Sequence, residues 1–233
     1  MNRTGLNWWC DRAWIKVGCV ITAVMVIAVL WNWEIWPDDL KIVAGVAALI
    51  PVHVIEEWVF PGGFHYHYNV LMKSPEPNRT PMCRLSDMFT NFLTTIMYMI
   101  FTVFCAVSGN VPAGMLMATF LFGCLELFAH TMFGILMYVK FRSQGKTTIY
   151  GPGSITAYLG FGTLAYLSFL CLRGQELAGA DYGLCFGILA VILFGFILLP
   201  ESLIKRKKDH PYGFESAGYY ERFLKAEDAM NSR

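Results

Sequence analysis

The stretch AGMLMATFLFGCLELFAHTMFGILMY, residues 113–138, decides the fold. It is almost entirely apolar and is long enough for a helix to cross the roughly 30 Å hydrocarbon core of a bilayer. It nevertheless carries two ionisable side chains, Glu126 and His130. An ionisable group inside a membrane span costs roughly 2.5 to 3.5 kcal/mol on insertion scales, so its usual explanation is function. The stretch therefore predicts a membrane helix and part of a buried site.

Apolar runs of similar length recur along the chain, of whose 233 residues 56% are apolar and 15% charged. This composition excludes an ordinary soluble domain. Strict alternation of apolar and polar residues is absent, which argues against a membrane β-barrel. The predicted spans are about 14–30, 42–60, 87–107, 113–138, 154–172 and 184–203. We predict an all-α, multi-pass bundle of about six transmembrane helices in residues 1–205, followed by a tail at 206–233.

The basic residues predict how this bundle is oriented. All of the 18 Lys and Arg residues except Lys41 and Arg173 fall at the amino end, in the second and fourth connections, or in the tail. Because Lys and Arg accumulate in the segments that stay cytoplasmic, these regions belong on one side of the membrane. Both termini are therefore predicted to be cytoplasmic, and 206–233 is a cytoplasmic tail.

The second span ends in a second group of ionisable residues, the sequence HVIEE that begins at His53. At about 100° per residue, Glu57 lies about 40° from His53 and Glu56 about 60° to the other side, so one helix face can present all three. Glu126 and His130 repeat the spacing of four residues. In the predicted topology both groups lie on the order of 10 Å inside the cytoplasmic boundary. We therefore expect the two groups to form one site.

Four more polar residues near this point are additional candidates. Asp87 and Asn91 open the third span, where the position of Asp87 also suits a helix N-cap. His65 and His67 lie in the connection after the second span, within FHYHYN. They would form the cytoplasmic rim of the site, although a loop histidine beside tyrosines is more often a surface residue. His210 is predicted to lie outside the site.

The predicted ligand set suits a divalent metal ion. Its members are His53, Glu56, Glu57, Glu126 and His130, of which Glu57 and Glu126 are also the candidates for acid–base catalysis. Two imidazoles cannot neutralise three carboxylates, so a metal, a proton or a substrate cation is expected among them. Nitrogen and oxygen donors suit iron, manganese or zinc. The structural alternative is a set of salt bridges that only hold two helices together.

Two motifs resemble a known family. HVIEE at 53–57 with the later His130, and YGPGSITAYL at 150–159, resemble the HXXEE-domain family of small bacterial membrane proteins. The resemblance covers about residues 42–200 and implies a multi-pass protein of the bacterial inner membrane, but little about reaction or substrate. The chain departs from the family pattern by Gly151, where Asn is expected, and by its extended FHYHYN segment.

Four activities are consistent with these residues. Non-haem iron oxidation is favoured, with a dinuclear site if Asp87 adds a fourth carboxylate. Zinc-dependent hydrolysis inside the membrane, with one glutamate as general base, is the main alternative. A metal-free His/Glu isomerase and a proton- or cation-coupled transporter are further alternatives, the transporter being disfavoured because the halves show no repeat. The expected partner is a lipid or another hydrophobic small molecule, bound in the cytoplasmic half of the bilayer, and no nucleic acid is expected.

Overall fold

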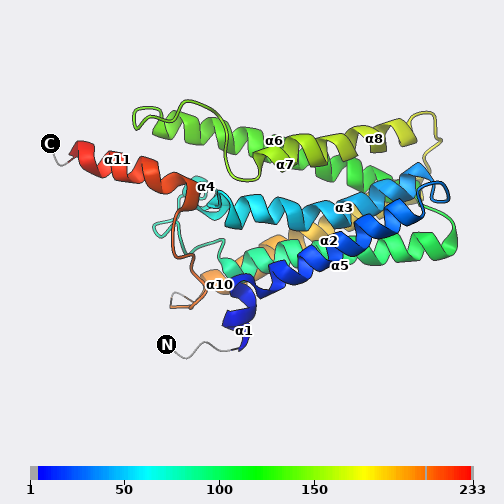
Figure 1. The fold of residues 1–233 in the computed structure, drawn as a ribbon, viewed down its shortest axis with the longest axis horizontal. Helices are drawn as coiled ribbons and strands as arrows, with labels where there is room; N and C mark the ends of the chain where they lie inside the picture. The colour runs from blue at the N-terminus through cyan, green and yellow to red at the C-terminus, as the bar shows by residue number, and fades with distance from the viewer. Residues whose placement is uncertain (1–4, 208, 232–233) are drawn as a thin grey trace.

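The computed structural model describes residues 5–207 and 209–231, and within them every regular element is a helix (Figure 1). The first residues of the predicted cytoplasmic amino end, residue 208 and the end of the tail at 232–233 lie outside the described part. Six helices are long and apolar enough to cross a membrane, judged by length and composition. The all-α prediction and the predicted number of spans are therefore confirmed, and they identify an integral membrane protein.

The six spans are Trp14–Trp31, Asp38–Val59, Arg84–Ser108, Ala113–Phe141, Ser154–Leu172 and Gly179–Lys205. The first, third and fourth are the single helices α2, α5 and α6. The second consists of α3 (Asp38–Val54) and a π-helical turn, η2 (Ile55–Val59). The fifth consists of α7 (Ser154–Thr156), η3 (Ala157–Phe161) and α8 (Gly162–Leu172), and the sixth of α9 (Gly179–Ala190), η4 (Val191–Leu198) and α10 (Leu199–Lys205). Outside the spans lie α1 (Gly5–Trp8), η1 (Trp9–Ala13), α4 (Phe64–Leu71), η5 (Gly218–Tyr220) and α11 (Glu221–Asn231).

The ends of the spanning helices follow local rules. Pro37 precedes α3 in an extended conformation, and Asp38 and Asp39 fill the first turn, where carboxylates interact favourably with the helix dipole. Gly109 ends α5 in the left-handed region at φ 67°, which glycine adopts without steric penalty. Pro112 then occupies the position before α6.

Glycines on α6 allow its neighbours to approach closely. A Cβ atom on Gly123 would lie 2.6 Å from the Phe161 carbonyl oxygen, and one on Gly134 would lie 2.1 Å from the Ile149 carbonyl oxygen. Membrane helices pack through small residues because lipid supplies no hydrophobic driving force between them. These glycines therefore place the start of the fifth span directly against the half of α6 that carries Glu126 and His130.

The second span is the centre of the bundle. It packs against α2, α5 and α8, and it is the most buried of the six spans. The amino and carboxyl ends of the described chain lie at the same end of the bundle, as expected if both are cytoplasmic (Figure 1). His53 and the two following glutamates lie toward this end, at the junction of α3 and η2.

The tail folds back onto the same end of the bundle. The backbone N–H of Phe214 donates to the Asn78 carbonyl at 2.7 Å, and that of Tyr219 donates to the Gly62 carbonyl at 3.0 Å. Tyr220 and Phe223 pack against Phe141 at the end of α6. The tail ends in helix α11, and the segment before this helix covers α4 and the end of the second span.

Candidate metal centre

The second and fourth spans bring four side chains together as a closed ring. His53 Nε2 lies 3.2 Å from Glu57 Oε1 and 3.6 Å from Glu126 Oε2. His130 Nε2 lies 3.6 Å from each of the same two carboxylate oxygens. Histidine and glutamate alternate around this donor ring, which consists of His53, Glu57, Glu126 and His130. The predicted match in membrane depth between the two spans is therefore what the structure shows.

The donor ring has the spacing of a metal site. Around a tetrahedral ion with bonds of about 2.0–2.1 Å, neighbouring donor atoms lie about 3.3–3.4 Å apart. The four distances of 3.2 to 3.6 Å bracket that value. One donor atom from each of His53, Glu126 and His130 lies within 4.8 Å of the others. These buried residues could bind a divalent metal ion.

Glu56 lies outside the ring, although the sequence placed it among the ligands. Its Oε1 accepts from the backbone N–H of Ile155 at 3.1 Å and from the Tyr150 hydroxyl at 3.2 Å. Its Oε2 accepts from the backbone N–H and the hydroxyl of Thr156 at 2.9 and 2.7 Å. Both glutamates lie in the π-helical turn η2, and as adjacent helical residues they point in different directions, Glu57 to the ring and Glu56 to the first turn of the fifth span. A carboxylate is favourable there because the first N–H groups of a helix have no partner within it.

Thr156 connects Glu56 to the ring. Its hydroxyl lies 2.7 Å from His53 Nδ1 and donates to Glu56. Since that hydroxyl has one hydrogen, it accepts from His53 Nδ1–H while it donates to the carboxylate. This relay leaves the Nε2 lone pair of His53 pointing into the ring, where a metal ion needs it. The hydroxyl also lies 3.2 Å from the Gly153 carbonyl oxygen, a local contact typical of a helix start, whereas a relay to a distant histidine has no local signature in the sequence.

His130 is buried without a hydrogen bond at either ring nitrogen. Buried polar atoms without partners are rare in folded proteins and point to an ion, a water or a functional role. The ring packs against the backbone of Gly153, where a Cβ atom would lie 2.2 Å from His130 Cε1 and where φ is +89°. Only glycine suits this position. The YGPG segment therefore shapes one wall of the donor ring, and Pro152 precedes the fifth span instead of lying in its first turn.

Asp87 and Asn91 approach the ring from α5. Asp87 is buried and accepts from the Trp58 indole N–H and from Asn91 Nδ2. The N-cap prediction for Asp87 is wrong, because Cys83 occupies the N-cap and its backbone N–H donates to Ser86 Oγ at 2.9 Å. Asp87 lies one turn further in, where its carboxylate faces the bundle interior.

A cavity of about 180 Å³ adjoins the donor ring. Its walls include His53, Glu57 and Glu126 from the ring, together with Asp87 and Asn91. The remaining lining residues are Phe64, Tyr68, Met82, Thr90, Ala129, Phe133 and Ile197. Asp87 and Asn91 therefore share a cavity with three members of the ring.

His65 and His67 are neither surface residues nor part of the ring. Both are buried in α4, a helix that the sequence suggested would be a loop. The His65 ring stacks on Phe214 at 3.7 Å, and burial lowers the pKa of His65 to about 3. His67 Nδ1 pairs with the Tyr220 hydroxyl at 2.9 Å, and burial lowers its pKa well below the ordinary range. Both histidines fasten the tail to α4. His210 also lies away from the ring, as predicted, stacked on Tyr212.

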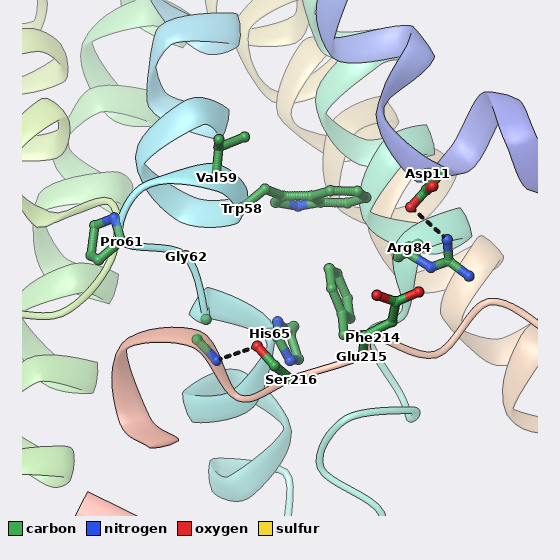
Figure 2. Close-up of a pocket in the computed structure, with 12 residues that line it drawn as sticks. Asp11, Trp58, Val59, Pro61, Gly62, His65, Arg84, Phe214, Glu215 and Ser216 are labelled. Carbon is green, nitrogen blue, oxygen red and sulfur yellow. Dashed lines mark hydrogen bonds and ion pairs between the residues drawn. The ribbon is translucent and has the colours of Figure 1, made fainter. Parts of the chain in front are cut away.

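A second pocket of about 230 Å³ lies under the tail, on the other side of Trp58. Figure 2 shows the ion pair of Asp11 and Arg84 on one side of this tail pocket, and the rings of Trp58, His65 and Phe214 in its middle. The Arg84 guanidinium also donates to the Pro211 and Gly213 carbonyls. The polar groups here pair with one another and join the amino end, α5 and the tail.

Three functional positions escaped the sequence analysis. Glu201 is buried at the end of the predicted sixth span, and the argument from insertion cost applies to it as well. The Tyr68 hydroxyl donates to Glu201 Oε2 at 3.1 Å, and Tyr68 lines the cavity beside the ring. Tyr150 donates to Glu56, and burial and that carboxylate raise the pKa of Tyr150, which keeps its hydroxyl protonated as a donor.

Comparison of the chain with protein-family models, with curated proteins and with solved structures finds no match. The resemblance to the HXXEE-domain family therefore stays a prediction from two short motifs.

Proposed function

We propose that the chain is a membrane-embedded metalloenzyme that acts on a hydrophobic substrate in the cytoplasmic half of the bilayer. The observation that carries the proposal is the donor ring, in which two imidazoles and two carboxylates converge at metal-ligand spacing inside a membrane span. The cavity beside the ring gives a substrate access to three of its four members. The relay through Thr156 presets His53 as a metal ligand.

Zinc-dependent hydrolysis is the activity that this geometry supports best. Two histidines and one carboxylate are a complete ligand set for catalytic zinc, with the fourth position left for water. His53, His130 and Glu126 would form that set, which leaves Glu57, 3.2 Å from His53, as the general base. A divalent ion at this site would lower the pKa of bound water and polarise a substrate carbonyl.

Iron-dependent oxidation is the second candidate, and Asp87 is the observation that favours it. Two histidines and one carboxylate also suit non-haem iron. A dinuclear iron site needs more carboxylates, usually four with two histidines. Glu56 accepts hydrogen bonds from four donors and is therefore not free to bind a metal, which removes one of the predicted carboxylate ligands. Asp87 lies on the wall of the cavity beside the donor ring and could replace it.

Salt bridging without metal is the competing explanation. With Glu56 engaged elsewhere, two protonated imidazoles would neutralise the two ring carboxylates, so the charge imbalance inferred from the sequence does not hold within the ring itself. However, three of its four contacts are 3.6 Å, beyond hydrogen-bond length, and His130 makes no hydrogen bond. If the ring served only for ion pairing, its nitrogen and oxygen atoms would be expected to lie within hydrogen-bond distance of one another.

The test is metal stoichiometry in the full chain, purified in detergent, stripped with a chelator and reloaded with Zn²⁺ or Fe²⁺. We expect one equivalent of zinc in the wild type and less than a tenth of that in His53→Ala and His130→Ala. His65→Phe, which changes a buried histidine outside the ring and keeps its ring stacking, should bind like the wild type. Two equivalents of iron in the wild type would favour oxidation instead. Absence of bound metal from active protein would overturn both activities and leave the isomerase and the transporter.

A further inference from the structure

The cavity beside the donor ring is too small to enclose a whole lipid. Pockets that bury a drug-sized molecule measure roughly 300–1,000 Å³, whereas this cavity measures about 180 Å³. Only a small group at one end of a hydrophobic substrate can therefore reach the ring. The rest of that molecule must remain outside the cavity.

The lining residues show where the cavity opens. Its deep wall is buried and is formed by His53, Glu57, Met82 and Asp87. Its other side is formed by half-buried residues, namely Ala129 and Phe133 of α6, Thr90 and Asn91 of α5, Ile197 of η4, and Phe64 and Tyr68 of α4. Glu126 agrees with this pattern, because its side chain is 24% exposed while His53, Glu57 and His130 are at most 4% exposed. The opening therefore lies between α6 and the pair formed by α5 and η4, with α4 at its edge.

The course of the sixth span explains the opening. This span packs against α6 through α9, but against α5 through η4 and α10. Within η4, the Phe196 carbonyl accepts from Thr90 Oγ1 at 2.8 Å, which holds this part of the span to α5. The two helices that border the opening therefore separate where the donor ring lies.

The opening faces lipid. Asn91 lies seven residues from the cytoplasmic end of α5 and Ala129 lies twelve from that of α6, which places them about 10 and 18 Å along their helices. A bilayer has a hydrocarbon core of roughly 30 Å, so both depths fall within its cytoplasmic half or near its middle. The neighbouring outer face of α6 is apolar and exposed, with Leu125 at 56% and Phe128 at 65%. A hydrocarbon chain can lie along that face.

The polar groups inside the cavity define the head of the molecule that enters. Three carboxylates line it, those of Glu57, Asp87 and Glu126, and its lining contains neither Lys nor Arg. Asn91 directs its amide N–H groups to Asp87, which leaves its carbonyl oxygen as a further acceptor. The three carboxylates outnumber the charge of one divalent ion, so the site stays negative with the ion bound, and a negatively charged phosphate head group is disfavoured. An uncharged head with an O–H or N–H donor fits.

We propose that the substrate is a neutral lipid with a small uncharged head that carries a hydrogen-bond donor, such as a fatty amide or alcohol. It enters head first from the cytoplasmic leaflet between α6 and η4, and its hydrocarbon tail stays in the bilayer. The inference rests on the proposed metal site, whose chemistry would act on the head. To that proposal the inference adds the route by which the substrate enters, its orientation in the cavity, and the discrimination against phospholipid head groups.

The experiment uses metal-loaded full chain in lipid nanodiscs and two amphiphiles with the same chain, dodecanohydroxamic acid and dodecyl phosphate. The hydroxamic acid has a small head that is neutral in solution at pH 7 and loses its O–H proton when it binds a metal ion, and a cavity carboxylate can accept that proton. Binding is read from the absorption bands of Co²⁺ loaded in place of the native metal. We expect the hydroxamate to bind at least tenfold more tightly than the phosphate. Equal affinities would overturn the proposed choice of head group.

Variants at the opening test whether the substrate enters through it. Ala129→Trp and Ile197→Trp each place a large side chain in the opening, one from α6 and one from η4. Because the two positions are on different helices, we expect at least one of the two variants to fold. Each should keep its metal and lose at least tenfold in hydroxamate affinity. Ile27→Trp, on the exposed face of α2 and away from the cavity, should bind like the wild type. Wild-type affinity in both folded opening variants would overturn lateral entry, whereas failure of the wild type to bind Co²⁺ would overturn the metal site itself.

Discussion

Two groups of charged residues at the end of the bundle that carries both termini differ in how completely their hydrogen bonds are satisfied. The Arg84 guanidinium donates to Asp11, Asn7 and two tail carbonyls at 2.8 to 3.2 Å. In the donor ring the four contacts are 3.2 to 3.6 Å, and His130 has no hydrogen bond. Charge-assisted hydrogen bonds at normal length stabilise a fold, while converging groups that leave polar atoms unpaired indicate a ligand. The first group holds segments of the chain together, and the second could bind a divalent metal ion.

The largest effect is expected from breaking the first group with Arg84→Met. Removing one partner of a buried ion pair typically costs about 3–5 kcal/mol, because the other partners lose their compensation. Arg84 also joins the amino end and the tail to α5. We expect a marked drop in the melting temperature of the variant in detergent. Arg142→Met, at an exposed position, should change stability by about 0.5 kcal/mol or less. Equal melting temperatures for the two variants would contradict this role of Arg84.

Metal binding to the donor ring should stabilise the folded protein by an amount somewhat smaller than the loss expected for Arg84→Met. A ligand that binds the folded state alone stabilises it by about 2.7 kcal/mol when its free concentration is one hundred times its dissociation constant. We therefore expect Zn²⁺ to raise the melting temperature of the wild type and a chelator to reverse the rise. Glu126→Gln should remove most of this rise, since it takes one donor from the ring. A rise of the same size in Glu126→Gln would show that the metal binds elsewhere.

The relay through Thr156 should contribute less to metal affinity than a residue that binds the metal directly. Thr156→Val keeps the shape of the side chain but removes the hydroxyl between His53 and Glu56. Partners that orient a metal ligand typically contribute 10–100-fold in affinity, and we expect a loss of about that size with unchanged stoichiometry. Competition with a chromogenic chelator measures it. Thr163→Val, which removes an exposed hydroxyl in the same span, is the control and should leave affinity unchanged. An equal effect of both substitutions would contradict the relay.

The smallest expected effect is the loss of stability at low pH that arises from the buried His65. Burial lowers its pKa to about 3 from an ordinary 6.5, so the unfolded chain takes up a proton in this range before the folded chain does. Stability is then lost as pH falls from about 6.5 toward 3, by at most about 1.4 kcal/mol per pH unit. His65→Phe keeps the stacking on Phe214 and cannot titrate, so its melting temperature should fall less than that of the wild type between pH 7.5 and 5.5. Equal acid sensitivity would show that His65 does not titrate on unfolding.

The sequence was most informative where a local property decides the outcome. Span length and composition predicted six membrane helices, and the four-residue spacing of Glu126 and His130 predicted two side chains on one face. The regular helical angle of about 100° per residue also placed Glu56 on the ligand face, whereas it turns to the fifth span, because η2 does not follow that repeat and adjacent helical residues point in different directions. Hydrogen bonds from Tyr150, Ile155 and Thr156 hold Glu56 there.

The burial of residues near the chain termini was not predicted either. The segment FHYHYN was expected to be a connecting loop whose histidines form the rim of the site, whereas it is a helix covered by the tail, and its two buried histidines contact tail residues. Asp87 was assigned to a helix end from its place in the span, and Cys83 with Ser86 fills that role. In each case a segment distant in sequence determines the environment.

The sequence by itself determined that this chain is a membrane bundle and that His53, Glu57, Glu126 and His130 occupy one depth, because hydrophobic length and helical spacing are local. The tertiary structure alone decided which carboxylates face the ring, which histidines the tail covers, and where the cavity opens. These depend on how helices far apart in sequence pack, through the glycines of α6, the turn η2 and the divergence of the sixth span from α6.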